Sequence, residues 1–383
     1  MLSGACQQVL AAGEDYVPIL QYGPSTGHPT LKNELSRWLG EHYNVNTGPD
    51  RICVTGGASQ GLSCILQSFT DPNYTKAIWI VAPCYYLACG IFEDSGFSGK
   101  LRAVPEDEEG LNLGVLRDKI SQLEHDEQQK PPLKSVKYPG TTRKLYRHVV
   151  YIVPTCANPS GKTMSLRRRE ELVKMAREKN ILVVCDDVYD FLQWFVTPKG
   201  QEGNQSDLRL PRLCDIERAM DFSEQDPLHF GYTISNGSFS KIAGPGVRTG
   251  WVEATSKFVT GLGDTASTLS GGAPSQLCAA ILGESLRSGY YVREESLPVA
   301  DAAVEEENLA IGYGRMFEVR GDEDSAPFRG DIRISFAWEA EEAIVEGIQR
   351  LGSLLKRMLE DKAQYESGML KLKGQLKFVD CYK

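Results

Sequence analysis

Short apolar runs alternate with amphipathic stretches along most of this chain. Runs that are apolar at consecutive positions are typical of strands buried on both faces of a parallel sheet. Between two of these runs, Leu166, Leu172 and Val173 share one helical face, and Ser165 can cap the helix. This strand–helix–strand order predicts an α/β fold with a mostly parallel sheet. The runs lie at residues 78–82, 149–153, 181–185 and 232–235.

Two more amphipathic helices are predicted from the same spacing. One covers residues 58–69 and begins directly after Gly56 and Gly57, so its first turn is a potential binding site for an anion. The other covers residues 344–358 and follows a strand-like segment at residues 331–337. We expect this tail to belong to a separate small domain.

Residues 124–147 interrupt the alternation with a polar stretch. They include two adjacent prolines, and basic groups gather in the second half. Because such a composition favours exposed loops over packed elements, we predict a surface insertion here.

Composition and charge narrow the kinds of partner. The 383 residues are 41% hydrophobic, which is enough for one large core and a second domain. The net charge of -9 comes without a basic block, so we expect no nucleic-acid or membrane partner. The 10 cysteines are scattered without a C-x-x-C pair, and the start lacks the features of a signal peptide. We therefore expect a cytoplasmic protein without a metal site that acts on small molecules.

Lys241 lies in the strongest chemical motif of the chain. The segment SFSKIAGPGVRTGW, residues 238–251, follows a predicted strand and contains Ser238, Lys241 and Arg248. A lysine amine condenses with an aldehyde, and a hydroxyl together with a guanidinium can hold a phosphate by charge-assisted hydrogen bonds. The motif therefore suits an aldehyde that carries a phosphate. The alternative is a turn rich in Ser and Gly with surface cations.

A second motif spans the ends of two predicted strands. Asn158 follows one strand, and Asp186 ends the next, with Tyr189 shortly after it. Doubly wound sheets bind cofactors at the carboxyl ends of adjacent parallel strands. An acid there can pair with a protonated ring nitrogen, and Asn158 and Tyr189 can hydrogen-bond a ring oxygen. On its own, the pair Asp186-Asp187 equally suits a helix cap or a Mg²⁺ ligand pair.

Together these motifs resemble those of the fold-type I pyridoxal 5'-phosphate (PLP) enzymes, specifically the class I/II aminotransferases. In that family N-P-x-G precedes D-x-x-Y, and S-x-S-K with a later arginine closes the set. All three stand here in that order, at residues 158–161, 186–189 and 238–248. The segments LQYGP, DDVYDFLQW and GRMFEVRGD are similar to those of 2-aminoadipate and kynurenine aminotransferases. The resemblance runs from Tyr22 to Arg333.

The resemblance implies a role for each matching residue. Lys241 would hold PLP as a Schiff base and, once freed, abstract the α-proton of the substrate. Asp186 would keep the ring nitrogen protonated, and Tyr189 would tune the imine. Arg333 would bind the substrate's α-carboxylate, and Tyr22 would reach the partner's phosphate in a homodimer. The remaining cofactor contacts would come from Gly57, Ala58, Ser59, Tyr85, Asn158, Ser238 and Arg248, with Tyr85 stacked on the ring.

The same resemblance implies a domain division and two departures from the family pattern. The large PLP-binding domain would cover residues 21–284, and a small α+β domain would combine residues 1–20 and 285–383. The QYGP segment begins as early as Gln21, and the stretch before GRMF lacks a Gly-Gly-aromatic hairpin. We therefore expect a shortened N-terminal arm, an incomplete small domain with weak turnover, and protease sensitivity at residues 290–312.

The implied reaction transfers an amino group between an L-amino acid, with 2-aminoadipate or an aromatic amino acid as candidates, and a 2-oxo acid. Two alternatives use the same residues. A PLP-dependent lyase or decarboxylase stays open because the motifs do not set the orientation of the substrate. A catalytically impaired PLP-binding protein stays open because of the two departures. A transcription factor with an aminotransferase-like domain is disfavoured, since no helix-turn-helix precedes Tyr22 and the charge is acidic.

Overall fold

The computed structural model divides into two compact units. The larger unit comprises residues 9–191 and 210–284, and the smaller one residues 1–8, 192–209 and 285–383. The domains predicted from the sequence also change after residue 284, and their boundaries stay a prediction. The structure describes residues 2–12, 19–129, 131, 133–192, 209–221, 223–288, 312–313, 332–333 and 341–360.

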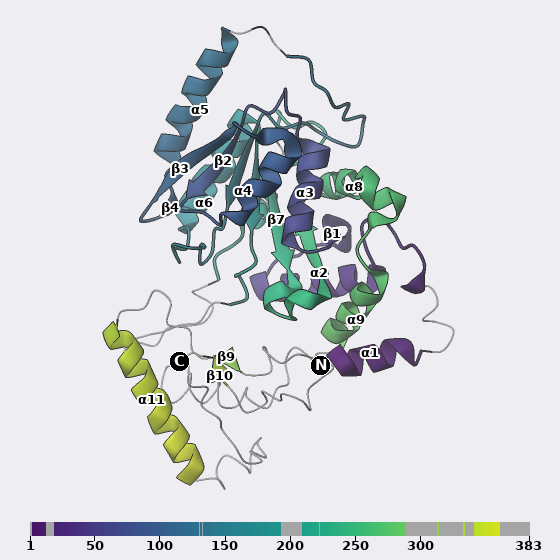
Figure 1. The fold of residues 1–383 in the computed structure, drawn as a ribbon, viewed down its shortest axis with the longest axis vertical. Coiled ribbons are helices and arrows are strands. Elements are labelled where there is room, and N and C mark those ends of the chain that lie inside the picture. Colours follow the sequence, from purple (N-terminus) through teal and green to yellow (C-terminus); the bar gives the residue numbers. More distant parts are fainter. Residues whose placement is uncertain are drawn as a thin grey trace. The chain divides into compact units, whose positions relative to one another are not determined.

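An eight-stranded sheet organises the larger unit (Figure 1), in the order β1-β8-β7-β6-β5-β2-β3-β4. The run from β3 through β2, β5 and β6 to β7 is parallel, whereas β8 pairs antiparallel with β7 and β1, and β4 with β3. This confirms the predicted α/β fold with a mostly parallel sheet. The strands are β1 Ile52–Thr55, β2 Ala77–Ala82, β3 Leu101–Asp107, β4 Gly110–Leu111, β5 His148–Ile152, β6 Ile181–Asp186, β7 Thr233–Ser238 and β8 Gly250–Glu253.

Helices pack around the sheet in two groups (Figure 1). In one group α3 contacts α4 and α8 as well as β7 and β8, and in the other α6 contacts α5, α7 and β6. The helices of the larger unit are α2 Pro29–Tyr43, α3 Ala58–Phe69, α4 Leu87–Phe92, α5 Leu113–Gln128, α6 Leu166–Lys179, α7 Leu213–Ala219, α8 Ser256–Gly263 and most of α9 Gln276–Arg287, whereas α1 Leu2–Leu10 lies mostly in the smaller unit.

The predicted helices α3 and α6 begin where local chemistry requires it. Gly57 precedes α3 with a φ of 104°, a conformation that side chains with a Cβ rarely adopt. Ser165 Oγ accepts a hydrogen bond from the Arg168 backbone N–H at 3.2 Å and so caps α6. Asn180, in the left-handed region with a φ of 51°, ends that helix. Both predicted helices are therefore confirmed.

The central parallel strands explain the apolar runs of the sequence. Every residue of β5, β6 and β7 is buried. Helices cover both faces of such a sheet, so its strands do not alternate between apolar and polar positions. The observed strands overlap the four predicted runs, with ends that differ by at most three residues.

The predicted surface insertion at residues 124–147 is wrong at both ends. Its first residues form the last turns of α5, which Asn112 caps by accepting from the Val115 N–H at 3.0 Å. Near its other end lies Tyr146, whose side chain is fully buried and whose hydroxyl donates a hydrogen bond to the Gly231 carbonyl at 2.5 Å. Between them, Asp71 Oδ2 accepts from two backbone N–H groups of the segment. The polar composition of this segment predicted a backbone that is hydrogen-bonded to water. Partners that are distant in the sequence form several of these hydrogen bonds instead.

Besides most of α1 and the last residues of α9, the smaller unit has two short strands and one long helix among its described residues. β9 Gly312–Tyr313 pairs antiparallel with β10 Ile332–Arg333, which is the described part of the strand predicted at residues 331–337. α11 Glu341–Glu360 contains the predicted helix at residues 344–358. Apart from Gly312, the region predicted to be protease-sensitive, residues 290–312, lies outside the described residues.

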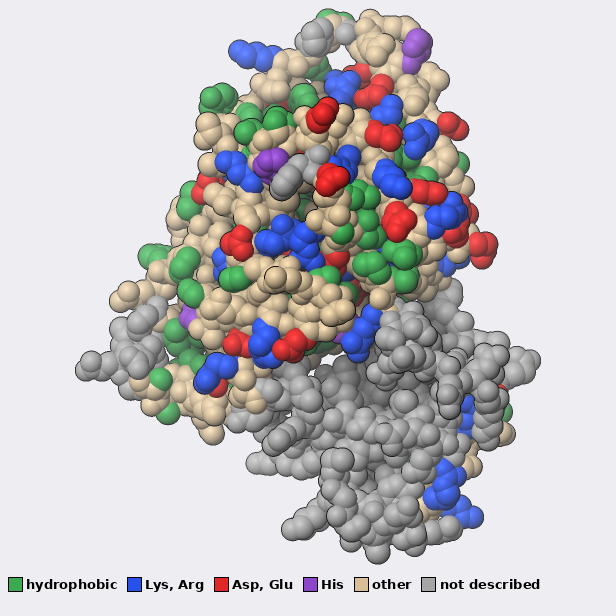
Figure 2. All heavy atoms as spheres, turned by 180° about the vertical axis from the view of Figure 1, so that it is seen from behind, with side chains coloured by type: hydrophobic (Ala, Val, Ile, Leu, Met, Phe, Trp, Pro, Cys, Tyr) green, Lys and Arg blue, Asp and Glu red, His purple; other side chains and the backbone are tan. Residues whose placement is uncertain are grey.

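The surface of the larger unit mixes charges of both signs. On the face shown in Figure 2, basic and acidic side chains intermingle, and neither sign forms a continuous field there. Across the described part of the chain, no helix is both long and apolar enough to traverse a lipid bilayer.

Candidate active site

A cavity of ≈ 280 Å³ opens where parallel strands of the sheet end. Asp186 is the last residue of β6 and Ser238 the last of β7, whereas Tyr85 follows β2 and Asn158 follows β5. Carboxyl ends of parallel strands meet at one edge of a sheet, so these four side chains converge. The cavity is lined by Ala58, Ser59, Tyr85, Val153, Asn158, Asp186, Val188, Tyr189, Ser238, Ser240, Lys241 and Arg248.

Asp186 is a buried carboxylate with one hydrogen-bonded oxygen and one that has no partner among the described residues. Tyr151 donates its hydroxyl hydrogen bond to Asp186 Oδ2 at 2.5 Å. Oδ1 has no hydrogen-bond partner within the described part of the chain. Burial raises the pKa of Asp186 to about 6, although the Tyr151 hydrogen bond and the charge of Lys241 both act to lower it. A proton donor next to Oδ1 would stabilise the ionised form.

Aromatic and amide groups surround the space next to Asp186. Asn158 Nδ2 donates to the Tyr189 hydroxyl at 3.2 Å, so two polar groups from different strand ends are held together. Tyr85 is half-buried on the cavity wall, and burial together with the nearby charge of Asp186 raises its pKa. The two tyrosines and the amide can thus frame a flat polar ring.

The other end of the cavity is built to hold an anion. Ala58 and Ser59 open α3, where backbone N–H groups have no helical acceptor. Arg248 lies beside them, because its Nη2 donates to the Gly56 carbonyl at 3.1 Å. Ser238 also lines this cavity. Free N–H groups, a guanidinium and a hydroxyl are together typical of a phosphate site.

Lys241 presents an exposed amine at the end of a short 3-10 turn, Phe239–Lys241. Ser238 Oγ caps that turn by accepting from the Ser240 N–H at 3.1 Å. Phe239 anchors the turn in the core, since the Phe239 ring is fully buried and packs edge-on against Trp251 at 5.1 Å between centroids. The backbone around Lys241 is therefore fixed, while the amine stays accessible to a ligand.

Two predicted site residues are not part of the described lining of this cavity. Tyr22 is 90% exposed and lines a separate groove formed by residues 19–25 and 268–277. Arg333 belongs to β10 in the smaller unit, and its side chain is outside the described residues. Their proposed roles therefore rest on the sequence. The other predicted residues line this cavity, except Gly57, which lies directly before α3.

Three polar residues of the site were missed from the sequence. Ser240 lines the cavity, and Asn236 in β7 donates to the Ala58 carbonyl at 3.0 Å, which ties the strand to the start of α3. Tyr151 contacts Asp186 from the neighbouring strand. For Tyr151 the available signal was its hydroxyl within a run of buried apolar residues, because such a group needs a partner.

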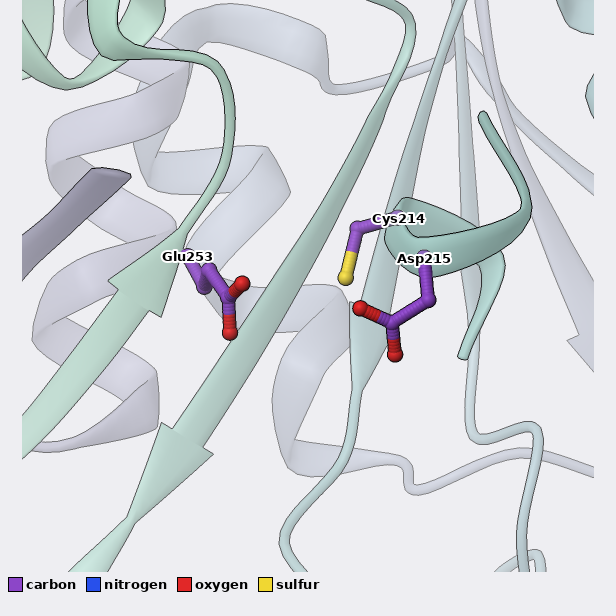
Figure 3. Close-up of side chains that lie close together, drawn as sticks. All are labelled: Cys214, Asp215 and Glu253. Atoms are coloured by element: carbon purple, nitrogen blue, oxygen red, sulfur yellow. The ribbon is translucent and has the colours of Figure 1, made fainter. Parts of the chain in front are cut away.

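A second polar cluster has the composition of a metal site. Cys214, Asp215 and Glu253 offer ligand-type atoms within 4.8 Å of one another (Figure 3). However, Arg212 Nε lies 2.9 Å from Asp215 Oδ2, and its Nη1 lies 2.8 Å from Glu253 Oε2. Arg218 also pairs with Asp215 at 2.8 Å. Because guanidinium groups already balance both carboxylates, we interpret the cluster as a buried ion-pair network.

The donor set of the cavity fits PLP. Lys241 supplies an amine for the aldehyde, and the open Oδ1 of buried Asp186 can accept a hydrogen bond from a protonated ring nitrogen. The start of α3 and Arg248 suit the phosphate group. A parallel sheet with this arrangement at its carboxyl edge defines the class of α/β enzymes that use PLP.

Within that class, the chain belongs to the aminotransferase class I and II family, whose pattern it matches over residues 5–295. It is 35% identical over 283 residues to an uncharacterised protein of Saccharomyces cerevisiae, covering 70% of this chain and 62% of the relative. It is 29% identical over 240 residues to aromatic-amino-acid aminotransferase 1 of Thermococcus litoralis, covering 63% and 47%. The chain thus spans less than two thirds of the length of either relative.

The fold is shared with solved structures. The α-aminoadipate aminotransferase of Thermus thermophilus, complexed with N-(5'-phosphopyridoxyl)-L-leucine, matches with a TM-score of 0.55 at 22% identity, over 94% of this chain and 88% of that chain. At this identity the likeness shows the fold alone. Together with the family match, it confirms the fold-type I resemblance predicted from the motifs.

Gly57→Ala should damage the anion-binding end of the cavity. Gly57 has a φ of 104°, and an added Cβ would lie 3.0 Å from Arg248 Nη2. We expect a loss of about 1–2 kcal/mol in the free energy of unfolding and weaker binding of PLP and of inorganic phosphate. Urea unfolding and fluorescence titration measure the two effects. Gly246→Ala is the matched control, because a Cβ there meets nothing within 4 Å. Equal effects of both changes would contradict the assigned role.

Proposed function

We propose that this chain is a PLP-dependent aminotransferase that moves an amino group between an L-amino acid and a 2-oxo acid. The observation that carries this proposal is the single cavity that joins Lys241, Asp186 and the anion-binding start of α3. When bound there, PLP supplies an aldehyde that condenses with amines and a ring that withdraws electrons.

Each group of residues in the cavity has a separate role in this proposal. Lys241 accepts the α-proton of the substrate and returns a proton later, as a positioned general base and acid. With PLP bound, Asp186 would hold a proton on the ring nitrogen through Oδ1, while Asn158 and Tyr189 would hydrogen-bond the ring oxygen. Tyr85 would cover one face of the ring. The phosphate would be held by Gly57, Ala58, Ser59, Ser238 and Arg248.

The substrate side of the proposal rests on Arg333 and on the relatives. A planar guanidinium can bind an α-carboxylate with two parallel hydrogen bonds, and we assign that contact to Arg333. The names of the relatives point to an aromatic amino acid or 2-aminoadipate as the donor. We also propose a cytoplasmic location, because the nine cysteines among the described residues are all free.

A half-reaction experiment tests the proposal. The purified protein is loaded with PLP, and single amino acids are added while the visible spectrum is followed. We expect the visible absorbance to fall with 2-aminoadipate or an aromatic amino acid and to return on addition of 2-oxoglutarate. Release of carbon dioxide or ammonia without a 2-oxo acid would instead indicate a decarboxylase or lyase. A stable spectrum with every amino acid would indicate an impaired PLP-binding protein.

Tyr22 leads us to propose a homodimer with shared sites. Its ring is 90% exposed, and Leu20 and Leu269 beside it in the same groove are also exposed. An apolar surface of this kind is typical of an interface. We propose that Tyr22 of one protomer contacts the phosphate bound to the other.

Mixing two inactive variants should restore activity if sites are shared. Tyr22→Ala and Lys241→Ala homodimers would each lack one component, whereas a mixed dimer would contain one complete site. After subunit exchange we expect up to about a quarter of wild-type activity, because half of the dimers are mixed and each has one intact site of two. Tyr138→Ala, which alters a tyrosine that is also exposed, should remain active alone. No recovery after verified exchange would contradict a site shared in trans.

A further inference from the structure

Tyr151 brings a polar group to the site from a strand that otherwise only supports it. It lies in β5, where it pairs in register with Val184 of β6, two residues before Asp186. Its side chain is 3% exposed, and its ring packs edge-on against Phe92 at 5.6 Å between centroids. The only hydrogen bond of its hydroxyl in the described part of the chain is the one to Asp186 Oδ2, at 2.5 Å.

This hydrogen bond makes the two carboxylate oxygens of Asp186 inequivalent. Oδ2 accepts from Tyr151, while Oδ1 has no partner in the described residues. A carboxylate with both oxygens open could rotate about its Cβ–Cγ bond. Fixing one oxygen from the side of β5 removes that freedom and leaves the other oxygen for a ligand.

The hydroxyl remains a donor over the working pH range. Burial and the charge of Asp186 raise the pKa of Tyr151 well above its ordinary value, so the phenol stays protonated. Donation to a carboxylate stabilises its ionised form, and this hydrogen bond opposes the rise in the Asp186 pKa that burial causes. Without it, more of Asp186 would be protonated near neutral pH.

We propose that Tyr151 is a positioning residue that orients the Asp186 carboxylate, keeps it ionised, and reserves Oδ1 for the ring nitrogen of PLP. This inference rests on the proposed function for its ligand, but the Tyr151–Asp186 pair itself belongs to the chain. The other titratable groups that face the pair are Lys241 from the turn after β7, Tyr85 after β2, and Tyr189 after β6. None of these donates a hydrogen bond to Asp186 in the described part of the chain, so Tyr151 alone can fix its orientation there.

The first measurement uses the protein without cofactor. Urea unfolding between pH 4 and 8 gives the stability that Asp186→Asn adds, and the pH at which this gain levels off reports the pKa of Asp186 in the folded protein. In a Tyr151→Phe background we expect this levelling-off pH to rise by about one unit or more. The matched control is Tyr146→Phe, which also removes a buried hydroxyl with a 2.5 Å hydrogen bond, but to the Gly231 carbonyl. It should lower stability without moving the levelling-off pH.

The second measurement is the dissociation constant of PLP. At pH 7.5 we expect Tyr151→Phe to weaken binding by about tenfold, the value of a hydrogen bond to a charged group. With Asp186→Asn already present, the same change should have less than about a twofold effect, because no carboxylate remains for Tyr151 to keep ionised. An unshifted levelling-off pH, or a tenfold loss that persists with Asp186→Asn, would overturn the positioning role. If the wild-type protein failed to bind PLP, the proposed function would be wrong, and the levelling-off pH of the cofactor-free protein would still decide the role of Tyr151.

Discussion

Lys241→Ala should yield a protein that folds, binds PLP weakly and lacks the visible colour of the wild type. Among the described residues, Lys241 is the one lysine that lines the cavity, and in our proposal its exposed amine is both the covalent anchor and the general base. Its removal should reduce amino-group transfer by on the order of 10⁴-fold, the upper end of what a positioned acid–base group contributes. Steady-state kinetics and the visible spectrum measure these losses.

Peptide mapping after borohydride reduction identifies the anchoring lysine directly. In the wild type we expect the phosphopyridoxyl group on Lys241, and in Lys241→Ala we expect no labelled site. Lys257→Ala is a suitable control, because that lysine lies in α8 with its Nζ 5.7 Å from the Phe230 ring and does not line the cavity. Label on any other lysine of the wild type would refute the assignment.

Asp186→Asn should stabilise the cofactor-free protein and strongly reduce the activity of the PLP-bound protein. The pKa of Asp186 is raised by burial to about 6, above the 3.8 of an ordinary aspartate. Its ionised form therefore destabilises the fold. This penalty is absent below about pH 4, grows as the pH rises toward 6, and is complete above it. We expect Asp186→Asn to add about 3 kcal/mol to the free energy of unfolding at pH 8 and close to nothing at pH 4.

The same variant should lose function because an amide cannot hold the ring nitrogen protonated. We expect exchange of the substrate's α-proton to fall by about 10²–10³-fold, as for the loss of one preorganised electrostatic contact. Hydrogen–deuterium exchange at the α-carbon, followed by mass spectrometry, measures it. Asp221→Asn removes an exposed acid and controls for the change in net charge. Wild-type exchange rates, or a stability gain that is equal at pH 4 and pH 8, would show that Asp186 does not have this role.

Much of the site could be predicted because its residues sit at strand ends. The buried runs of β5, β6 and β7 are readable from consecutive apolar positions, and the chemistry follows where each run stops. Asp186 and Ser238 end their strands, so placing the strands also placed these residues at one edge of the sheet. The start of α3 was equally readable, because two glycines precede an amphipathic repeat.

The rest depends on contacts between distant segments. The Tyr151–Asp186 hydrogen bond follows from the register of β5 against β6, and sequence spacing does not define register. The polar stretch before β5 was misread for a related reason, since Asp71 supplies hydrogen-bond acceptors to it from far away in the chain. A residue such as Tyr22, whose proposed contact is with a second protomer, has no partner to reveal within one chain.

The loop that joins the antiparallel strands β7 and β8 carries residues for both ends of the proposed ligand. Ser238 and Gly250 are opposite each other in the sheet, and the loop between them carries both Lys241 and Arg248. The length of this loop therefore sets the distance between the Lys241 amine and the Arg248 guanidinium. Inserting or deleting a single residue in the loop would change the size of the molecule that both groups can bind at the same time. Substitutions at the other positions of this loop would leave the spacing of Lys241 and Arg248 unchanged, whereas a change in its length would not.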